Sequence, residues 1–205
     1  MSTTAAMPAA PGPTGHAVAP GSYTRVAVWL HWIIAALIVA QLIGGVVMHK
    51  LPDTVDFKIQ AYQLHKSFGL TILALALFRL GWRLTHRAPP LPEGTPSLVR
   101  GLARATQVGF YVLMIAVPLA GWLMVSASPY PSSFFFLAPI PDLPGAGILS
   151  GDAWAEAHEY LAFGIIGLLV LHVAGALKHH LVDRDGVLAR MVPGMAKPTP
   201  KESPA

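Results

Sequence analysis

Four long apolar runs constrain this chain more than any other feature of its sequence. They cover about residues 26–48, 67–82, 102–125 and 157–177, and the second extends backwards through residues 61–66. A transmembrane α-helix needs about 20 mainly apolar residues at about 1.5 Å each, and every run meets this to within a turn. The pattern therefore predicts an all-α membrane protein, a bundle of four transmembrane helices.

Composition favours a lipid-facing surface over a water-facing one. Charged residues make up only 12% of the chain, whereas a typical soluble domain carries about 25%. The net charge of +4 and the high pI, taken alone, are compatible with a nucleic-acid partner. Most basic residues, however, flank the apolar runs instead of alternating with aromatic residues. We therefore expect membrane lipid, and no nucleic acid, as a partner.

The chain is predicted to divide into one domain and two tails. Residues 1–22 are rich in Ala, Pro, Gly, Ser and Thr and lack the basic start and apolar core of a signal peptide, so we expect a disordered N-terminal tail. Residues 23–191 hold the four apolar runs. Residues 192–205 resemble the first segment in character, so we expect a disordered C-terminal tail.

Lysine and arginine are distributed unevenly between the two sides of the predicted bundle. The side that carries both termini has ten of them: Arg25, Arg83, Arg87, Arg100, Arg104, Lys178, Arg184, Arg190, Lys197 and Lys201. The opposite side has only Lys50, Lys58 and Lys66. Because loops rich in Lys and Arg remain in the cytoplasm, both termini are predicted to be cytoplasmic.

Histidine is the residue type that points to chemistry. Four of the nine histidines lie in the apolar runs or at their edges: His31, His65, His158 and His172. An ionisable side chain inside a bilayer is costly and usually functional, although a single one is often a hydrogen-bonded core residue or a relay group. No role is assigned to the other five: His16, His49, His86, His179 and His180.

Two of the four histidines lie at one depth, near the cytoplasmic side. His31 follows Arg25 by six residues, which corresponds to about 9 Å along a helix. His172 precedes His180 by eight residues, which corresponds to about 12 Å from the same side. The first and fourth helices are therefore predicted to bring these two rings to the same level.

The other two histidines lie together near the opposite side. His65 precedes Arg83 by 18 residues, about 27 Å, and His158 precedes His180 by 22 residues, about 33 Å. These depths agree to within about one turn. A pair between His31 and either of them is excluded, because the depths differ by roughly 18 Å or more. The sequence thus predicts two histidine pairs at two depths.

Two such pairs are typical of two haems stacked across a bilayer. His158 and His172 are 14 residues apart, which returns them to nearly the same helix face, about 21 Å apart. A haem iron takes one neutral imidazole on each side of its plane. The chain has no cysteine, which excludes covalent attachment and leaves b-type haem. We predict that His31 and His172 ligate one haem b, and His65 and His158 a second.

Further residues suit a site for two macrocycles. Arg79 lies inside the second run towards the cytoplasmic side, and a haem propionate is its predicted partner, with lipid phosphate as the alternative. Glycines thin the helices where a flat ring needs room, although close helix packing explains any one of them equally well. These are Gly44, Gly45, Gly69, Gly121, Gly164 and Gly167.

Several motifs of the chain resemble the bacterial cytochrome b561 family. They are residues 22–25 (Ser-Tyr-Thr-Arg), 30–32 (Leu-His-Trp), 64–69 (Leu-His-Lys-Ser-Phe-Gly), Arg79 and Arg83 ahead of 89–92 (Pro-Pro-Leu-Pro), 157–159 (Ala-His-Glu), 171–172 (Leu-His), 179–180 (His-His) and 188–193 (Leu-Ala-Arg-Met-Val-Pro). The similarity covers about residues 23–194, and the combination is specific although each piece alone is weak.

The resemblance implies a di-haem four-helix cytochrome of the bacterial inner membrane, with His31, His172, His65 and His158 as axial ligands. Members of this family move electrons between a membrane quinone and a second redox partner. One branch is similar to superoxide oxidases, which pass electrons from periplasmic superoxide to ubiquinone. With both axial positions filled, one-electron transfer is favoured over oxygen binding. We therefore expect a membrane oxidoreductase of the superoxide:ubiquinone type.

Two alternatives stay open. A quinol-linked haem subunit would pass electrons to a soluble redox protein, and a histidine-based proton or metal transporter would use the same side chains without haem. The transporter is disfavoured because the chain has neither an intramembrane series of acids nor a sign of inverted repeats. A homo-oligomer is compatible with either alternative.

Lys66 is the residue that we predict to attract superoxide. Superoxide is a small anion, and Lys66 directly follows His65 on the side with few basic residues. The alternative is that Lys66 only anchors the end of its helix at the membrane interface.

Overall fold

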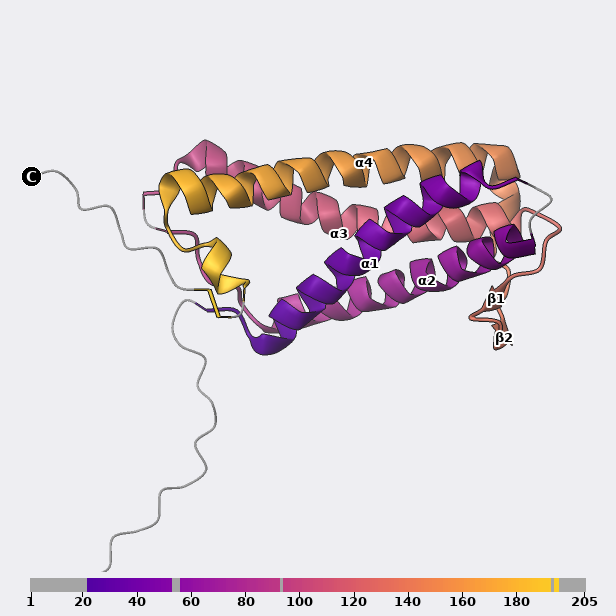
Figure 1. Ribbon diagram of the computed structural model, residues 1–205, viewed down its shortest axis with the longest axis horizontal. Helices are drawn as coiled ribbons and strands as arrows, with labels where there is room; N and C mark the ends of the chain where they lie inside the picture. Colours follow the sequence, from indigo (N-terminus) through magenta and orange to yellow (C-terminus); the bar gives the residue numbers. More distant parts are fainter. Residues whose placement is uncertain (1–21, 53–55, 93, 193, 196–205) are drawn as a thin grey trace, which may run out of the picture.

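The computed structural model describes residues 22–52, 56–92, 94–192 and 194–195, and four long helices dominate it (Figure 1). The helices are α1 (Arg25–Lys50), α2 (Asp56–Thr85), α3 (Ser97–Ser126) and α4 (Gly151–Lys178). Each is long and apolar enough to cross a membrane, with a mean hydropathy between 1.4 and 2.3 in its most apolar window. The predicted all-α bundle is therefore confirmed. The tails predicted at 1–22 and 192–205 fall almost entirely outside the described residues.

Each helix is longer than the apolar run that predicts it. The largest difference is in α2, which is predicted over residues 61–82 and has 30 residues in the structure. Only the apolar part of a helix must lie in hydrocarbon, and polar turns continue the same hydrogen-bond ladder outside it. Side-chain caps mark the start of two of the helices, α1 and α4. Thr24 accepts a hydrogen bond from the Ala27 amide, and Ser150 accepts one from the Ala153 amide, both at 3.2 Å.

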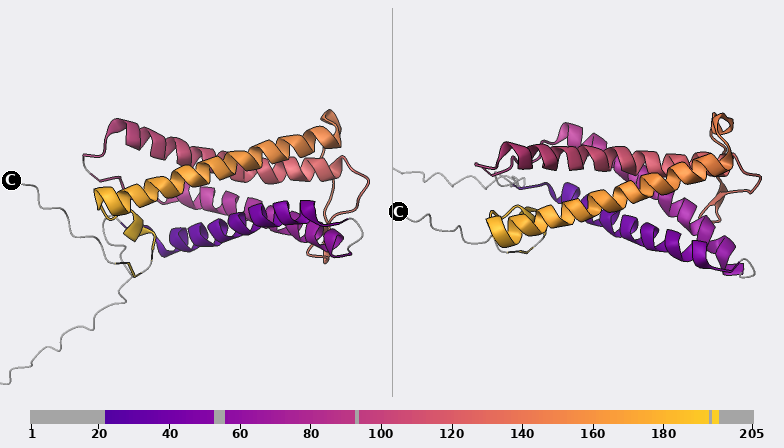
Figure 2. Two further views of the ribbon diagram at one scale, coloured as in Figure 1. Left: turned by 45° about the horizontal axis from the view of Figure 1, so that its top comes forward. Right: turned by 90° about the horizontal axis from the view of Figure 1, so that it is seen from above.

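The chain runs up and down, so both ends of the described chain lie at the same end of the bundle (Figure 1). We call this end, where α1 begins and α4 ends, the terminal end. The opposite end carries a short β-hairpin, described below, and we call it the hairpin end. Helix α3 packs most extensively against α4, while α2 packs against both α1 and α3 (Figure 2). A small buried core at mid-height joins all four helices: Ile34, Ile38, Ile72, Ala76, Met114 and Ile165.

Most of the apolar surface faces away from the bundle. No more than 17% of the most apolar window of any of the four helices is buried inside the protein. In a water-soluble bundle the apolar stripe of each helix would face the core instead. Lipid must therefore cover the outer faces, as expected for transmembrane helices.

A short β-hairpin between α3 and α4 folds down along the hairpin end of α2 (Figure 1). Its strands are β1 (Ser133–Phe134) and β2 (Ala138–Pro139), which pair antiparallel. Gln63 of α2 binds it twice, donating to the Pro131 carbonyl at 3.1 Å and accepting from the Ser133 amide at 3.2 Å. The fully buried Ser67 hydroxyl accepts from the Phe135 amide at 2.8 Å. The hairpin is thus fixed to the helix segment that carries His65.

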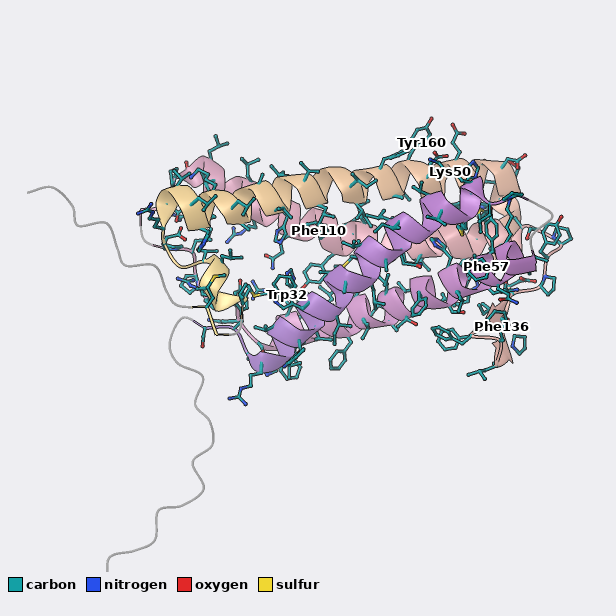
Figure 3. All side chains as sticks on the ribbon, in the orientation of Figure 1. Trp32, Lys50, Phe57, Phe110, Phe136 and Tyr160 are labelled. Carbon is teal, nitrogen blue, oxygen red and sulfur yellow. The ribbon has the colours of Figure 1, made fainter. Side chains whose placement is uncertain are left out.

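The chain after α4 closes the terminal end. A π-helical turn (His179–Asp183) and a 3₁₀ turn (Leu188–Arg190) bring it back towards α1. The Trp32 indole, labelled in Figure 3, donates to the Met191 carbonyl at 2.6 Å. The Arg190 guanidinium donates to the Pro90 carbonyl at 2.7 Å, which ties this segment to the α2–α3 connection. A further 3₁₀ turn (Ala146–Ile148) precedes α4 at the other end.

Candidate functional site

The four intramembrane histidines lie as two pairs of neighbouring rings. His31 of α1 and His172 of α4 have ring centroids 5.9 Å apart, with an interplanar angle of 59°. His65 of α2 and His158 of α4 have centroids 6.2 Å apart, with an angle of 76°. The structure therefore brings together the two combinations that the depth comparison favours, and α4 contributes one ring to each. Their role as metal ligands stays a prediction.

The His158 ring is held by the backbone of α3. Its Nδ1 donates a hydrogen bond to the Val117 carbonyl at 2.9 Å, because a carbonyl can only accept. The ring also lies against Gly121, where an added Cβ would be only 3.0 Å from its Cε1 and Nδ1 atoms. The bond places the hydrogen on Nδ1 and leaves Nε2 with a free lone pair. Such an arrangement of a backbone acceptor behind the ring is common for histidines that bind metals.

His65 lacks the partner that His158 has. Its Nδ1 is buried and has no hydrogen-bond partner among the described residues. Its backbone carbonyl accepts from the Gln41 side chain at 2.8 Å, and its Cε1 lies 3.6 Å from the Cβ position of Gly45. A buried polar atom without a partner is rare in a folded protein and calls for a reason. A group that is bound at the ring is one such reason.

Arg79 reaches from α2 to the His31–His172 pair. Its guanidinium makes two long contacts of 3.5 Å, one to the Ala27 carbonyl and one to Nδ1 of His31. A guanidinium has five N–H donors, and an intramembrane charge is costly unless it is paired. The ring of Phe110 packs edge-on against His172 with centroids 5.6 Å apart. The ring of Trp32 lies edge-on to His31 with centroids 5.3 Å apart, so one cation and two aromatic rings flank the terminal-end pair.

Lys66 lies on the other flank, at the hairpin end. Its ammonium donates to the Ser132 hydroxyl of the hairpin at 3.0 Å. Lys58, also on α2, donates to the Leu51 carbonyl at 2.9 Å, and Lys50 ends α1 in an exposed position. Of these three lysines, Lys66 is therefore the one next to a paired histidine and directed at the hairpin.

Comparison with known proteins decides the family. Residues 22–194 match the family model described as prokaryotic cytochrome b561. The chain belongs to the prokaryotic cytochrome b561 family. The chain is 33% identical over 174 residues to cytochrome b561 homolog 2 of Escherichia coli strain K12, covering 84% of this chain and 92% of that protein. It is 31% identical to cytochrome b562 of Cereibacter sphaeroides, covering 84% and 96%. It is 28% identical to the probable superoxide oxidase CybB of Yersinia pestis, covering 83% and 96%.

Membership of the cytochrome b561 family implies a bacterial membrane protein that transfers electrons through b-type haem. The donor set suits that group. In each pair imidazoles from two different helices are neighbours, the chain has no cysteine for covalent attachment, and the buried Nδ1 of His65 lacks a partner among the described residues. The residues of the chain therefore fit the cofactor of its family.

The remaining histidines lie away from the two pairs. His49 lies in the last turn of α1, and His86 follows α2 and stacks on Trp82. His179 binds Asp185 at 2.5 Å in the π-helical turn, where His180 also lies. His16 is outside the described residues. None of the four described histidines outside the pairs therefore contributes to either pair.

Sequence reasoning missed three polar groups that shape the site. The Val117 carbonyl and the Ser67 hydroxyl carry no signal in the sequence, because their partners are far away in the chain. Gln41 does carry one. It is a polar residue in the middle of an apolar run, where a polar side chain is as costly as the histidines are and equally indicates a specific role.

Proposed function

We propose that this protein carries electrons across the bacterial inner membrane through two haems b, from superoxide in the periplasm to a quinone in the bilayer. His31 and His172 would hold the haem at the terminal end, and His65 and His158 the one at the hairpin end. When bound, each haem would supply a one-electron redox centre. The side chains of the protein bind and orient the haems and attract the donor.

The spacing of the paired rings is the observation that carries the proposal. Metal–imidazole bonds are about 2 Å long and the ring nitrogen lies roughly 1 Å from the ring centre, so an iron between two rings needs about 6 Å between centres. The two pairs have 5.9 Å and 6.2 Å. Packed aromatic rings also lie about 4.5–7 Å apart, so the support comes from finding this spacing at both of the levels that the sequence predicts.

The proposed haem at the terminal end also explains why the cationic Arg79 lies beside His31 inside the membrane. Ligation through Nε2 leaves a hydrogen on Nδ1 of His31, and that nitrogen then cannot accept from the guanidinium. The 3.5 Å contact would be given up, and Arg79 would turn to a propionate as a charge-assisted partner. The role of Arg79 is therefore to hold the carboxylate edge of this haem.

The choice of superoxide rests on a relative and on charge. The Yersinia pestis relative is named a probable superoxide oxidase, and Lys66 supplies a cation beside His65 at the proposed periplasmic end. The reaction balances without a further reagent. Two superoxide anions each lose one electron and leave as O₂, and the quinone takes up the two electrons together with two protons from water.

A direct test uses the purified, oxidised holoprotein. Superoxide generated enzymatically should reduce the haem, excess superoxide dismutase should abolish the reduction, and decylubiquinone should reoxidise it. Reduction by a quinol but not by superoxide would assign the protein to the quinol-linked subunits that serve a soluble redox partner. Purified protein without any haem spectrum would favour the histidine-based transporter.

The Lys66→Gln variant tests the proposed attraction of superoxide. We expect the rate of haem reduction by superoxide to fall by about threefold at low ionic strength and to depend less on salt, since one steering charge is removed. Haem content should not change. Lys50→Gln, which removes a charge at the end of α1, is the matched control. Equal rates and equal salt dependence in Lys66→Gln and the parent would contradict this role.

The proposed topology has both termini in the cytoplasm, because ten of the basic residues in the sequence belong to the tails and connections on that side of the four apolar runs. A reporter enzyme fused to the C-terminus should be active only if it functions in the cytoplasm. A fusion that is active only in the periplasm would invert the assignment of both haems and of Lys66.

A further inference from the structure

The β-hairpin between α3 and α4 lies beside the membrane-spanning part of α2, not beyond its end (Figure 1). The Phe135 amide donates to the Ser67 hydroxyl at 2.8 Å, and the Phe135 ring packs on Phe68 with centroids 5.0 Å apart. Ser67 precedes Arg83 by 16 residues, which corresponds to about 24 Å along the helix, whereas the hydrocarbon core of a bilayer is about 30 Å thick. Counted from Arg83 at the terminal end, the hairpin therefore reaches about 6 Å into the hydrocarbon from the opposite side.

The backbone of the hairpin has the hydrogen bonding that a segment in hydrocarbon needs. Four of its N–H groups donate to acceptors 2.8–3.2 Å away: Ser133 to Gln63, Phe135 to Ser67, Leu137 to the Phe134 carbonyl and Ile140 to the Ser132 carbonyl. Positions 131, 139 and 141 are prolines, which have no N–H to satisfy. Water would bind such groups in a solvated loop, but acyl chains cannot, so each unpaired group would be costly there. A backbone of this kind can lie against acyl chains.

The tip of the hairpin presents apolar side chains outwards. Phe136 and Leu137 are 56% and 85% exposed, and Figure 3 shows Phe136 outside the four helices. Phe135 and Phe136 have φ values of 47° and 61°, where turns ordinarily use glycine or asparagine. A tip that keeps bulky apolar side chains in this conformation and leaves them exposed indicates a contact for them outside the chain.

We propose that the hairpin tip, Phe136 and Leu137, inserts into the acyl chains of the leaflet at the hairpin end and so anchors the hairpin in the membrane beside α2. Lipid is the occupant because the tip continues a surface that lipid already covers. The ring of Phe68, which is 36% exposed on α2, meets the ring of Phe135 at the start of the tip. The base of the hairpin is polar, since the Ser132 hydroxyl accepts from Lys66 there, and it then lies towards the headgroups.

The absence of cysteine from the chain allows a spin label to be attached at one chosen position at a time. Phe136→Cys and Leu137→Cys place the label at the tip. Phe163→Cys is the lipid reference, because Phe163 lies near the middle of α4 and is 56% exposed, as Phe136 is. Asp152→Cys is the water reference, because Asp152 is exposed in the first turn of α4 at the same end of the bundle.

The experiment measures, by EPR power saturation of the holoprotein in phospholipid bilayers, how often each label collides with dissolved oxygen and with a water-soluble nickel chelate. Oxygen concentrates in hydrocarbon, and the polar chelate is excluded from it. We expect the oxygen-to-nickel ratio of both tip labels to exceed that of Asp152→Cys by about tenfold and to approach that of Phe163→Cys. All four variants should keep the parent's haem-to-protein ratio and its reduced-minus-oxidised spectrum.

The opposite outcomes are equally clear. Tip ratios near that of Asp152→Cys would overturn the proposal, because the tip would then lie in water. Few collisions with either reagent would overturn it too, since a protein surface, such as a second copy of the chain, would then cover the tip. If Phe136→Cys loses haem, Leu137→Cys decides alone, because a side chain that is 85% exposed supports little of the fold. None of these results depends on whether superoxide or a quinol reduces the protein, so the insertion and the proposed function can fail separately.

Discussion

Replacing either member of a histidine pair by alanine is expected to remove one haem and leave the other. His31→Ala and His172→Ala should each lose the terminal-end haem, and His65→Ala and His158→Ala the hairpin-end haem. A b-type haem has no covalent attachment, so loss of one of its two axial ligands removes about half of its coordination to the protein. We expect the haem-to-protein ratio to fall from about two to about one in each single variant.

The pairing is measured by comparing spectra as well as by counting haem. Two variants of one pair should lose the same component of the reduced-minus-oxidised spectrum, and the double variant of that pair should lose no more. His49→Ala and His86→Ala, whose side chains lie at helix ends, should keep both haems. Identical losses in His31→Ala and His65→Ala would show that the rings are paired differently.

Filling the space at Gly121 is expected to remove the proposed hairpin-end haem without changing either of its proposed ligands. A side chain there begins 3.0 Å from two ring atoms of His158, which is closer than a Cβ normally approaches another atom. Gly121→Leu must displace the ring and break its bond to the Val117 carbonyl. Overpacking of this kind costs about 1–3 kcal/mol, and the displaced ring no longer keeps its place beside His65.

Gly121→Ala should give a graded effect, with both haems retained and the spectrum of one shifted. Gly81→Leu is the control, because a Cβ at Gly81 meets nothing within 4 Å. Haem content and thermal unfolding of the purified proteins are the measurements. Full retention of both haems in Gly121→Leu, with an unshifted spectrum, would mean that the His158 ring is not held by α3 as described.

The histidine depths could be predicted from the sequence because they depend on one constant. A helix rises by about 1.5 Å per residue whatever its neighbours are, so counting from the basic residues at the helix ends gives the level of each ring. The same periodicity places His158 and His172 on one face of α4. For this reason the sequence alone was sufficient to bring the right rings to the same levels.

The immediate surroundings of each ring could not be predicted in this way. Level does not specify which atom of a neighbouring helix faces a ring, since that depends on how the helices are rotated and how closely they approach. The Val117 carbonyl behind His158 and the Gln41 amide beside His65 both follow from such contacts. Gly121 could be suspected from the sequence but not distinguished from glycines that only pack helices.

The backbone conformation of the hairpin also could not be predicted from the sequence. Phe135 and Phe136 adopt φ values of 47° and 61°, a region that bulky residues seldom occupy. No local preference of these phenylalanines would favour that conformation, and a run of apolar aromatics predicts no turn. The buried Ser67 hydroxyl and the packing of Phe135 on Phe68, with ring centroids 5.0 Å apart, hold it in place.

The sequence by itself determined the helices, their membrane-spanning character and the levels of the four histidines. All three depend on local composition and on the fixed geometry of a helix, which are properties of short stretches of chain. Only the tertiary structure decided which atoms meet at those levels: the α3 backbone at His158, the hairpin on α2 and the Gln41 amide at His65. These depend on helix rotation and separation, which result from packing between residues that are far apart in the chain.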